Sequence, residues 1–279
     1  MSGLEILTVA LLVGAYVPAL RGMNEIWSSV DYFSHGPLVL PVALVVAWTK
    51  REALRTLPGR RDSRGALVLA FALLLYIFGL LGDQVSLQGV GLVLAVAGAV
   101  LFLRGPDWLG TLIFPIGYLV FMIPVPPEWI TPTINQLRLL VSRTAVDTLH
   151  LLDLPVAQAG NVILVPEGSL FVAEACSGIT SMITLIPVAV LLGYFTQTRF
   201  LPRLVLVLAV VPIAMLGNMV RVLFTVTAAL QVGPERATAG AIHEAAGALV
   251  YLFGCLVLLL VDHWVRRVVH TRVPTPERA

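Results

Sequence analysis

Long apolar stretches alternate with short polar ones along the chain. A helix of about 20 apolar residues crosses the hydrocarbon core of a bilayer. The stretches that come close to this length are 4–20, 36–49, 65–82, 86–103, 108–123, 177–195, 204–230 and 244–262. They predict an all-α polytopic membrane protein with about eight transmembrane helices, forming a single integral membrane domain over residues 1–279. The first stretch is predicted to be a retained span, because its basic neighbour Arg21 follows it, whereas a signal sequence is preceded by basic residues.

The segment 124–176 is different and is predicted to be extracytoplasmic. Prolines interrupt the chain just after the fifth predicted span, and residues 130–152 then carry an apolar stripe with helical steps of three and four. The stripe consists of Ile130, Ile134, Leu137, Val141, Ala145, Thr148 and Leu152, and the charged Arg138, Arg143 and Asp147 are assigned outside it. This pattern predicts an amphipathic helix on the outer surface.

Residues 161–173 alternate in polarity as strands do, around Pro166-Glu167-Gly168. They favour a short β-hairpin before the sixth predicted span. A binding platform or lid is one interpretation of the whole segment 124–176, and a decorated surface loop is the simpler one.

Composition narrows the class of protein. Of the 279 residues 58% are hydrophobic and 12% are charged, whereas soluble domains carry about 25% charged residues. A net charge of +2 is too small to suggest a nucleic-acid partner. Two cysteines make a disulfide framework improbable, and no metal-ligand spacing occurs, so we expect no metal and no cofactor.

The distribution of basic residues predicts the orientation. The positive-inside rule places basic loops in the cytoplasm, and counting spans from the loop 50–64 puts four basic groups on that side. These groups are Lys50, Arg51, Arg55, Arg60, Arg61 and Arg64; Arg104; Arg199 and Arg203; and Arg266, Arg267, Arg272 and Arg278. Both termini are then cytoplasmic, and the segment 124–176 is outside.

Cys176 lies where this outer segment enters the sixth predicted span. A helix N-terminus offers free backbone N–H groups and a partial positive charge, which favour the nucleophilic thiolate. A buried cysteine that only fills space is the simpler interpretation of this residue taken alone. Cys255 lies among leucines in the middle of a span, and there the space-filling interpretation is favoured.

Arg221 is the one charged residue between Leu204 and Leu230. An arginine inside a span is costly and must face water, a partner or a substrate. Asn218 lies three residues earlier, on the same helical face. Arg221 lies about 27 Å along the helix from Arg203, which is close to the far boundary of the bilayer core. A snorkelling arginine at a helix end is the alternative interpretation.

His243 opens the last predicted span and can act as an acid or a base near neutral pH. An interfacial histidine without a chemical role is equally compatible with its position alone. Together, however, Cys176, Arg221 and His243 are predicted to lie at one depth on the outer face. A thiol, a base and a guanidinium are the groups that acyl transfer requires, as nucleophile, proton carrier and oxyanion partner.

These residues and their neighbours resemble the exosortase and archaeosortase family of membrane transpeptidases. The resemblance covers most of the chain, and its motifs are specific in combination and in this order. They are Tyr32-Phe33-Ser34-His35-Gly36-Pro37-Leu38-Val39, Met122-Ile123-Pro124-Val125-Pro126, Ala159-Gly160-Asn161-Val162-Ile163, Glu174-Ala175-Cys176-Ser177-Gly178-Ile179, Asn218-Met219-Val220-Arg221 and His243-Glu244-Ala245-Ala246-Gly247.

The resemblance implies a multi-pass protein of the cell inner membrane with its active site on the extracytoplasmic face. Its partners would be the bilayer, exported proteins with a C-terminal sorting signal and a surface acceptor. In the bacterial branch the signal, called PEP-CTERM, is a Pro-Glu-Pro motif, a transmembrane helix and a basic tail. Cys176 would be the nucleophile, Arg221 the transition-state stabiliser and His243 the acid and base, with Asn218 and His35 as supporting residues.

Two other functions explain part of the pattern. A transporter or channel would account for Arg221 and for the prolines within spans, but not for a thiol and a histidine at the same depth. A component of exopolysaccharide assembly without catalysis would use the same helices as a scaffold. Trapping of a substrate through Cys176 distinguishes the enzyme from both.

Overall fold

The computed structural model describes residues 3–160, 162–166, 168–171, 178–238 and 240–271. It divides the chain into two compact units, Met1–Trp129 and Ile130–Ala279, which are described separately. The prediction of one integral membrane domain is not tested by this division.

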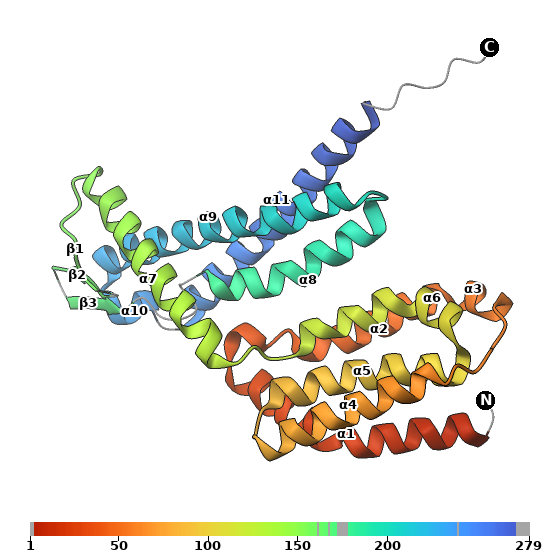
Figure 1. The fold of residues 1–279 in the computed structure, drawn as a ribbon. Helices are drawn as coiled ribbons and strands as arrows, with labels where there is room; N and C mark the ends of the chain where they lie inside the picture. Colours follow the sequence, from red (N-terminus) through yellow and green to blue (C-terminus); the bar gives the residue numbers. More distant parts are fainter. Residues whose placement is uncertain (1–2, 161, 167, 172–177, 239, 272–279) are drawn as a thin grey trace, which may run out of the picture. The chain divides into compact units, whose positions relative to one another are not determined.

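The first unit is a bundle of helices (Figure 1). Its elements are α1 (Gly3–Ser29), η1 (Asp31–Phe33), α2 (Gly36–Thr49), α3 (Arg51–Thr56), α4 (Arg64–Leu81), α5 (Val85–Arg104), α6 (Pro106–Tyr118) and η2 (Leu119–Met122). Glycines bring the backbones of α4 and α5 together, since a Cβ on Gly91 would lie 3.0 Å from the carbonyl oxygen of Ala72. Small residues allow such close packing inside a membrane, where lipid removes the hydrophobic drive for helices to associate.

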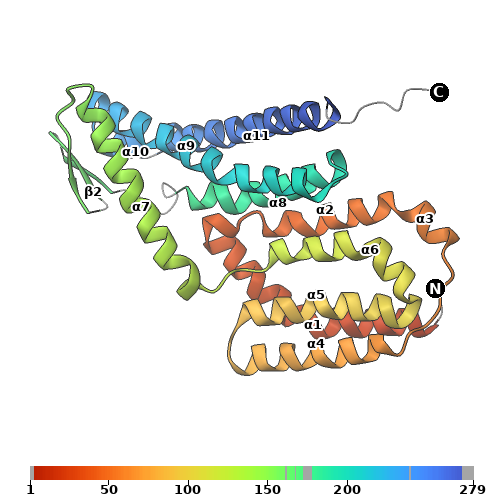
Figure 2. The same cartoon turned by 45° about the horizontal axis from the view of Figure 1, so that its top comes forward.

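The second unit combines a helix, a small sheet and a helical bundle, and Figure 2 shows these elements from a second direction. Its elements are α7 (Pro127–His150, which begins at the end of the first unit), β1 (Ala157–Ala159), β2 (Val162–Val165), β3 (Gly168–Phe171), α8 (Ile179–Thr196), α9 (Phe200–Val232), α10 (Pro234–Thr238) and α11 (Gly240–Thr271). Helices α8, α9 and α11 pack on one another, again at glycines. A Cβ on Gly217 of α9 would lie 2.9 Å from Val250 of α11, and one on Gly254 of α11 would lie 3.0 Å from Leu185 of α8.

The strands form an antiparallel sheet in the order β1-β2-β3. The predicted hairpin is confirmed, because Val165 pairs with Gly168 and Val162 with Phe171. Strand β1 was not predicted; it pairs with β2 through a second turn at Gly160, whose φ is +63°. Its three residues are too few to show an alternation in the sequence.

The amphipathic helix is confirmed as α7, and most of its apolar stripe packs on protein. Leu152 is an exception, because it lies beyond the end of α7 and is 65% exposed. The place of the helix on the outer surface stays a prediction. Val141 and Ala145 share a buried core with Ile163 and Leu170 of the sheet and with Val222 of α9. The assignment of Arg138 outside the stripe is wrong, because Arg138 is only 7% exposed. It follows Ile134 by one helical turn and precedes Val141 by three residues, so it lies on the buried face.

The membrane architecture agrees with the prediction. Within the described residues, seven helices are long and apolar enough to span a bilayer, or eight if a bent pair counts as one span. The bent pair is Pro106–Met122 with Pro127–His150, which meet at an angle of 72°. The protein is therefore an all-α multi-pass membrane protein with a small sheet. Helices α9 and α11 extend beyond the predicted spans 204–230 and 244–262.

Candidate active site

Arg221 lies in α9 one turn after Asn218, as the spacing predicts. The side chain of Asn218 is buried, with 2% of its surface exposed, and that of Arg221 is half-buried. A buried amide and a half-buried guanidinium thus follow each other on one face of a largely apolar helix.

The guanidinium of Arg221 lies against the backbone of α11 at Gly247. A Cβ built on Gly247 would be 3.4 Å from Nη2 of Arg221 and 3.6 Å from its Cζ. The guanidinium therefore lies directly beside this position, at a distance where a Cβ would make ordinary van der Waals contact with it. His243 lies one turn before Gly247, in the first turn of α11, and its side chain lies outside the described part of the structure.

The entry of α8 is fixed against α9 at Asn218. Gly178 precedes the first residue of the helix, is buried and has a φ of +79°, a conformation that favours glycine. A Cβ on Gly178 would lie 3.4 Å from Cβ of Asn218 and 3.7 Å from the carbonyl oxygen of Ala214. Cys176 comes two residues before Gly178 and lies outside the described residues.

Three segments that are distant in the sequence therefore meet, one of them being α9 itself. The chain just after Cys176 contacts Asn218, and the helix that begins around His243 contacts Arg221, one turn further along α9. These contacts are made by the neighbours of Cys176 and His243. The catalytic roles of the three residues remain predictions.

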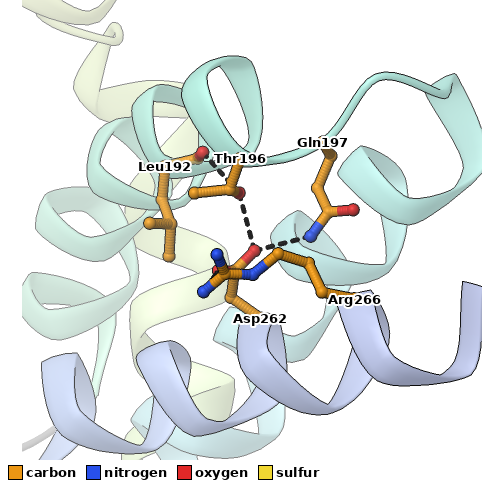
Figure 3. A network of polar contacts seen from close by, with 5 residues as sticks. All are labelled: Leu192, Thr196, Gln197, Asp262 and Arg266. Carbon is orange, nitrogen blue, oxygen red and sulfur yellow. Dashed lines mark hydrogen bonds and ion pairs between the residues drawn. The ribbon is translucent and has the colours of Figure 1, made fainter. Parts of the chain in front are cut away.

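A polar network joins α8 to α11 at the ends of these helices that lie far from Arg221 (Figure 3). The carboxylate of Asp262 in α11 is fully buried and accepts hydrogen bonds from Thr196 (2.7 Å) and Gln197 (2.6 Å) at the end of α8. Arg266 forms an ion pair with it at 2.9 Å. Asp262 lies about 28 Å from His243 along α11, at 1.5 Å per residue. The candidate site and this network are thus separated by about the thickness of a bilayer core.

His35 belongs to the first unit, where two of the sequence motifs meet. Its Nε2 lies 3.1 Å from the carbonyl oxygen of Phe121. Trp27 donates from Nε1 to the carbonyl of Met122 at 2.9 Å, and a Cβ on the neighbouring Gly36 would overlap the Trp27 indole. The segment around His35 therefore contacts the chain just before Pro124, and the supporting role of His35 stays a prediction.

Two polar residues of α7 are buried although their burial was not predicted from the sequence. Arg138 is 7% exposed, and Ser142, one turn later, is fully buried. The signal that could have found them is their spacing from Ile134 and Ala145, which places both on the buried stripe. Among the described residues, no group of three or more histidine, cysteine, aspartate or glutamate side chains could hold a metal ion.

The chain was compared with known proteins and with models of protein families. No curated protein and no solved structure matches the chain. A sequence model described as transmembrane exosortase (Exosortase_EpsH) matches residues 27–260, which is more than four fifths of the chain and includes the motifs around His35, Cys176, Arg221 and His243. The chain therefore belongs to the transmembrane exosortase family.

Proposed function

We propose that this exosortase is a membrane cysteine transpeptidase. It cleaves a C-terminal sorting signal of the PEP-CTERM kind from exported proteins and passes the processed protein to a surface acceptor. The observation that carries the proposal is the meeting of three motifs on α9, through Gly178 with Asn218 and Gly247 with Arg221. Membership of the family supports the same reaction class.

The proposed reaction is an acyl transfer in two steps. The thiolate of Cys176 attacks the carbonyl carbon of the scissile peptide bond, and the carbonyl oxygen becomes an oxyanion that the Arg221 guanidinium stabilises. The intermediate collapses to a thioester as the C–N bond breaks, and His243 protonates the amine of the departing signal. An acceptor nucleophile, or water, then loses its proton to His243, attacks the thioester and releases the Cys176 thiolate.

The proposed location is the cell inner membrane with the site facing outward. The basic loops support this orientation, since Arg203 and Arg266 lie at the end of the bundle opposite Arg221 and His243. The transmembrane helix of the C-terminal sorting signal would then reach the site from within the bilayer. The exported domain of the substrate would already be outside.

The nucleophile is tested by co-expression with a tagged protein that ends in a PEP-CTERM signal. Cys176→Ala should abolish the size shift of the tagged protein while the enzyme still accumulates in the membrane. Cys176→Ser should lose most of the activity, because a hydroxyl is far harder to ionise than a thiol. Cys255→Ala is the matched control and should process at the parent rate. Processing at the parent rate by Cys176→Ala would rule out covalent catalysis by this thiol.

A further inference from the structure

A cavity of about 370 Å³ opens between the start of β3 and the turn that joins α9 to α10. Its described walls are Gly168, Ser169, Val232, Gly233, Pro234, Glu235 and Arg236. Ser169 is exposed, whereas its neighbour Leu170 is buried in the core, so Ser169 points to the opposite face of the sheet. The cavity is thus lined by the strand that leads toward Cys176 and by the turn that leads toward His243.

The cavity lies along α9 from the candidate active site. A Cβ on Gly168 would lie 3.3 Å from Pro234, just beyond the end of α9, whereas Gly178 contacts Asn218 in the same helix. Gly168 therefore lies just beyond the end of α9, and Gly178 lies beside Asn218, earlier in the same helix. Val232, in the wall of the cavity, is 11 residues beyond Arg221, which corresponds to about 16 Å of helix.

The walls offer groups that an extended peptide can use. Strand β3 pairs with β2 on one edge, and its other edge takes no part in the described sheet. A Cβ on Gly233 would meet no atom within 4 Å, so the turn leaves open space. Glu235 and Arg236 are exposed, and no ion pair joins either of them to another described residue. Strand edges bind extended peptides through main-chain hydrogen bonds, and pockets beside them select alternate side chains.

We infer that this cavity is a substrate subsite, which binds the side chain of about the fifth residue before the scissile bond. An extended peptide advances about 3.3 Å per residue, so the path of about 16 Å from Arg221 takes five residues. The exported part of the substrate precedes the scissile bond and leaves the membrane in the direction in which α9 leads from Arg221 to Val232. The inference rests on the proposed function, which supplies the scissile bond.

The first test is a substitution scan of the substrate. The cleavage site of the tagged PEP-CTERM protein is mapped by mass spectrometry, and residues two to eight before the bond are changed one at a time to tryptophan or aspartate. For the parent enzyme, changes at about the fifth residue should alter kcat/KM about tenfold, mainly through KM. Ser169→Trp, which fills the cavity, should reduce this sensitivity to less than about twofold. Thr133→Trp, on the exposed face of α7, is the matched control and should keep the parent profile. A parent profile that is flat between the fourth and sixth residues, or unchanged in Ser169→Trp, would overturn the subsite.

The second test does not depend on turnover. A photoreactive amino acid replaces Ser169 or, as the control, Thr133 in a Cys176→Ala background, and each variant is illuminated with the tagged substrate in membranes. Crosslinking from position 169 to the segment before the signal supports the subsite even if no cleavage is ever observed, in which case the catalytic proposal alone fails. Absence of this crosslink, with or without cleavage by the parent, contradicts the subsite.

Discussion

At the scale of single residues, two glycines mark where distant parts of the chain approach α9. Gly178, just before α8, lies beside Asn218, and Gly247 of α11 lies beside the guanidinium of Arg221. A single Cβ at either position would make ordinary contact with its neighbour, so larger side chains are needed to displace it. At Gly178 the φ of +79° is a conformational reason for glycine that does not depend on any assumption about catalysis.

Enlarging Gly247 should displace Arg221. An alanine Cβ would be in ordinary contact with the guanidinium at 3.4 Å, so Gly247→Ala should keep most of the activity. Gly247→Leu needs the space of the guanidinium and should reduce substrate cleavage by about 100-fold, the typical effect of losing one oxyanion donor. The measurement is a cleavage time course at matched membrane abundance. Gly110→Leu is the control, because a Cβ at Gly110 meets no atom within 4 Å. Parent activity in Gly247→Leu would show that the contact does not position a catalytic group.

Replacement of Arg221 distinguishes a catalytic role of its guanidinium from that of a snorkelling arginine at a helix end. Arg221→Lys keeps the charge but loses the rigid fork of donors, and should reduce cleavage by about 100-fold. Arg221→Leu should be inactive yet well inserted, because removal of a charge eases insertion. If Arg221→Leu cleaves substrate near the parent rate in the same time course, Arg221 has only a structural role.

At the scale of secondary-structure elements, the bundle of α8, α9 and α11 is fixed at both ends. Glycine contacts bring the helices together near Arg221, and the carboxylate of Asp262 links α11 to the end of α8. Arg203 of α9 donates to the carbonyl oxygen of Gln197 at 2.9 Å, so the third helix joins the same cluster. The polar network at one end of the bundle thus fixes the three helices that carry the candidate site at the other end.

Removal of the Asp262 carboxylate should destabilise the bundle. Asp262→Ala leaves the donors of Thr196 and Gln197 without their buried acceptor, and should lower the free energy of unfolding by about 3 kcal/mol. The measurement is denaturant unfolding of the purified protein in detergent. Glu52→Ala removes an exposed carboxylate, which lies 3.8 Å from Arg51, and should cost less than about 1 kcal/mol. Equal effects of the two variants would contradict the structural importance of the network.

Hydropathy predicted the helices well because each span must bury its backbone polar groups within itself. The sequence was less informative where packing on other parts of the protein decides the structure. The stripe on α7 was visible, but its partner was not, since lipid and protein select the same apolar residues. Arg138 was assigned outside the stripe because it is charged, although its spacing places it inside. The motifs identified Cys176, Arg221 and His243, whereas the contact of Arg221 with Gly247 required coordinates.

At the scale of the whole molecule, the distribution of charge and the helix ends together predict the orientation. Basic residues gather at one end of the bundle in the second unit, and the candidate site lies about 27 Å away at the other. In the first unit, Arg104 is the last residue of α5 and pairs with Glu5 at 3.0 Å, on the side assigned to the cytoplasm. Each unit therefore carries its own indication of the same topology.

This topology is tested with single cysteines in a Cys176→Ala, Cys255→Ala background. A membrane-impermeant maleimide should label Asp147→Cys in intact cells, because α7 is predicted to lie outside. Ser63→Cys, in the loop between α3 and α4, should react only after the cells are permeabilised. The reverse pattern would place Arg221 and His243 on the cytoplasmic side and remove the proposed access to exported substrates.

The contact between Arg221 and Gly247 also has a consequence for the order of synthesis. Helix α9 leaves the ribosome before α11, so Arg221 enters the translocon before the surface that it packs against exists. An arginine held in hydrocarbon is costly, and we expect newly made α9 to stay displaced toward the headgroups until α11 arrives. The candidate site would then be completed only by the last described helix. A nascent chain that stalls earlier would then carry Cys176 without the complete candidate site.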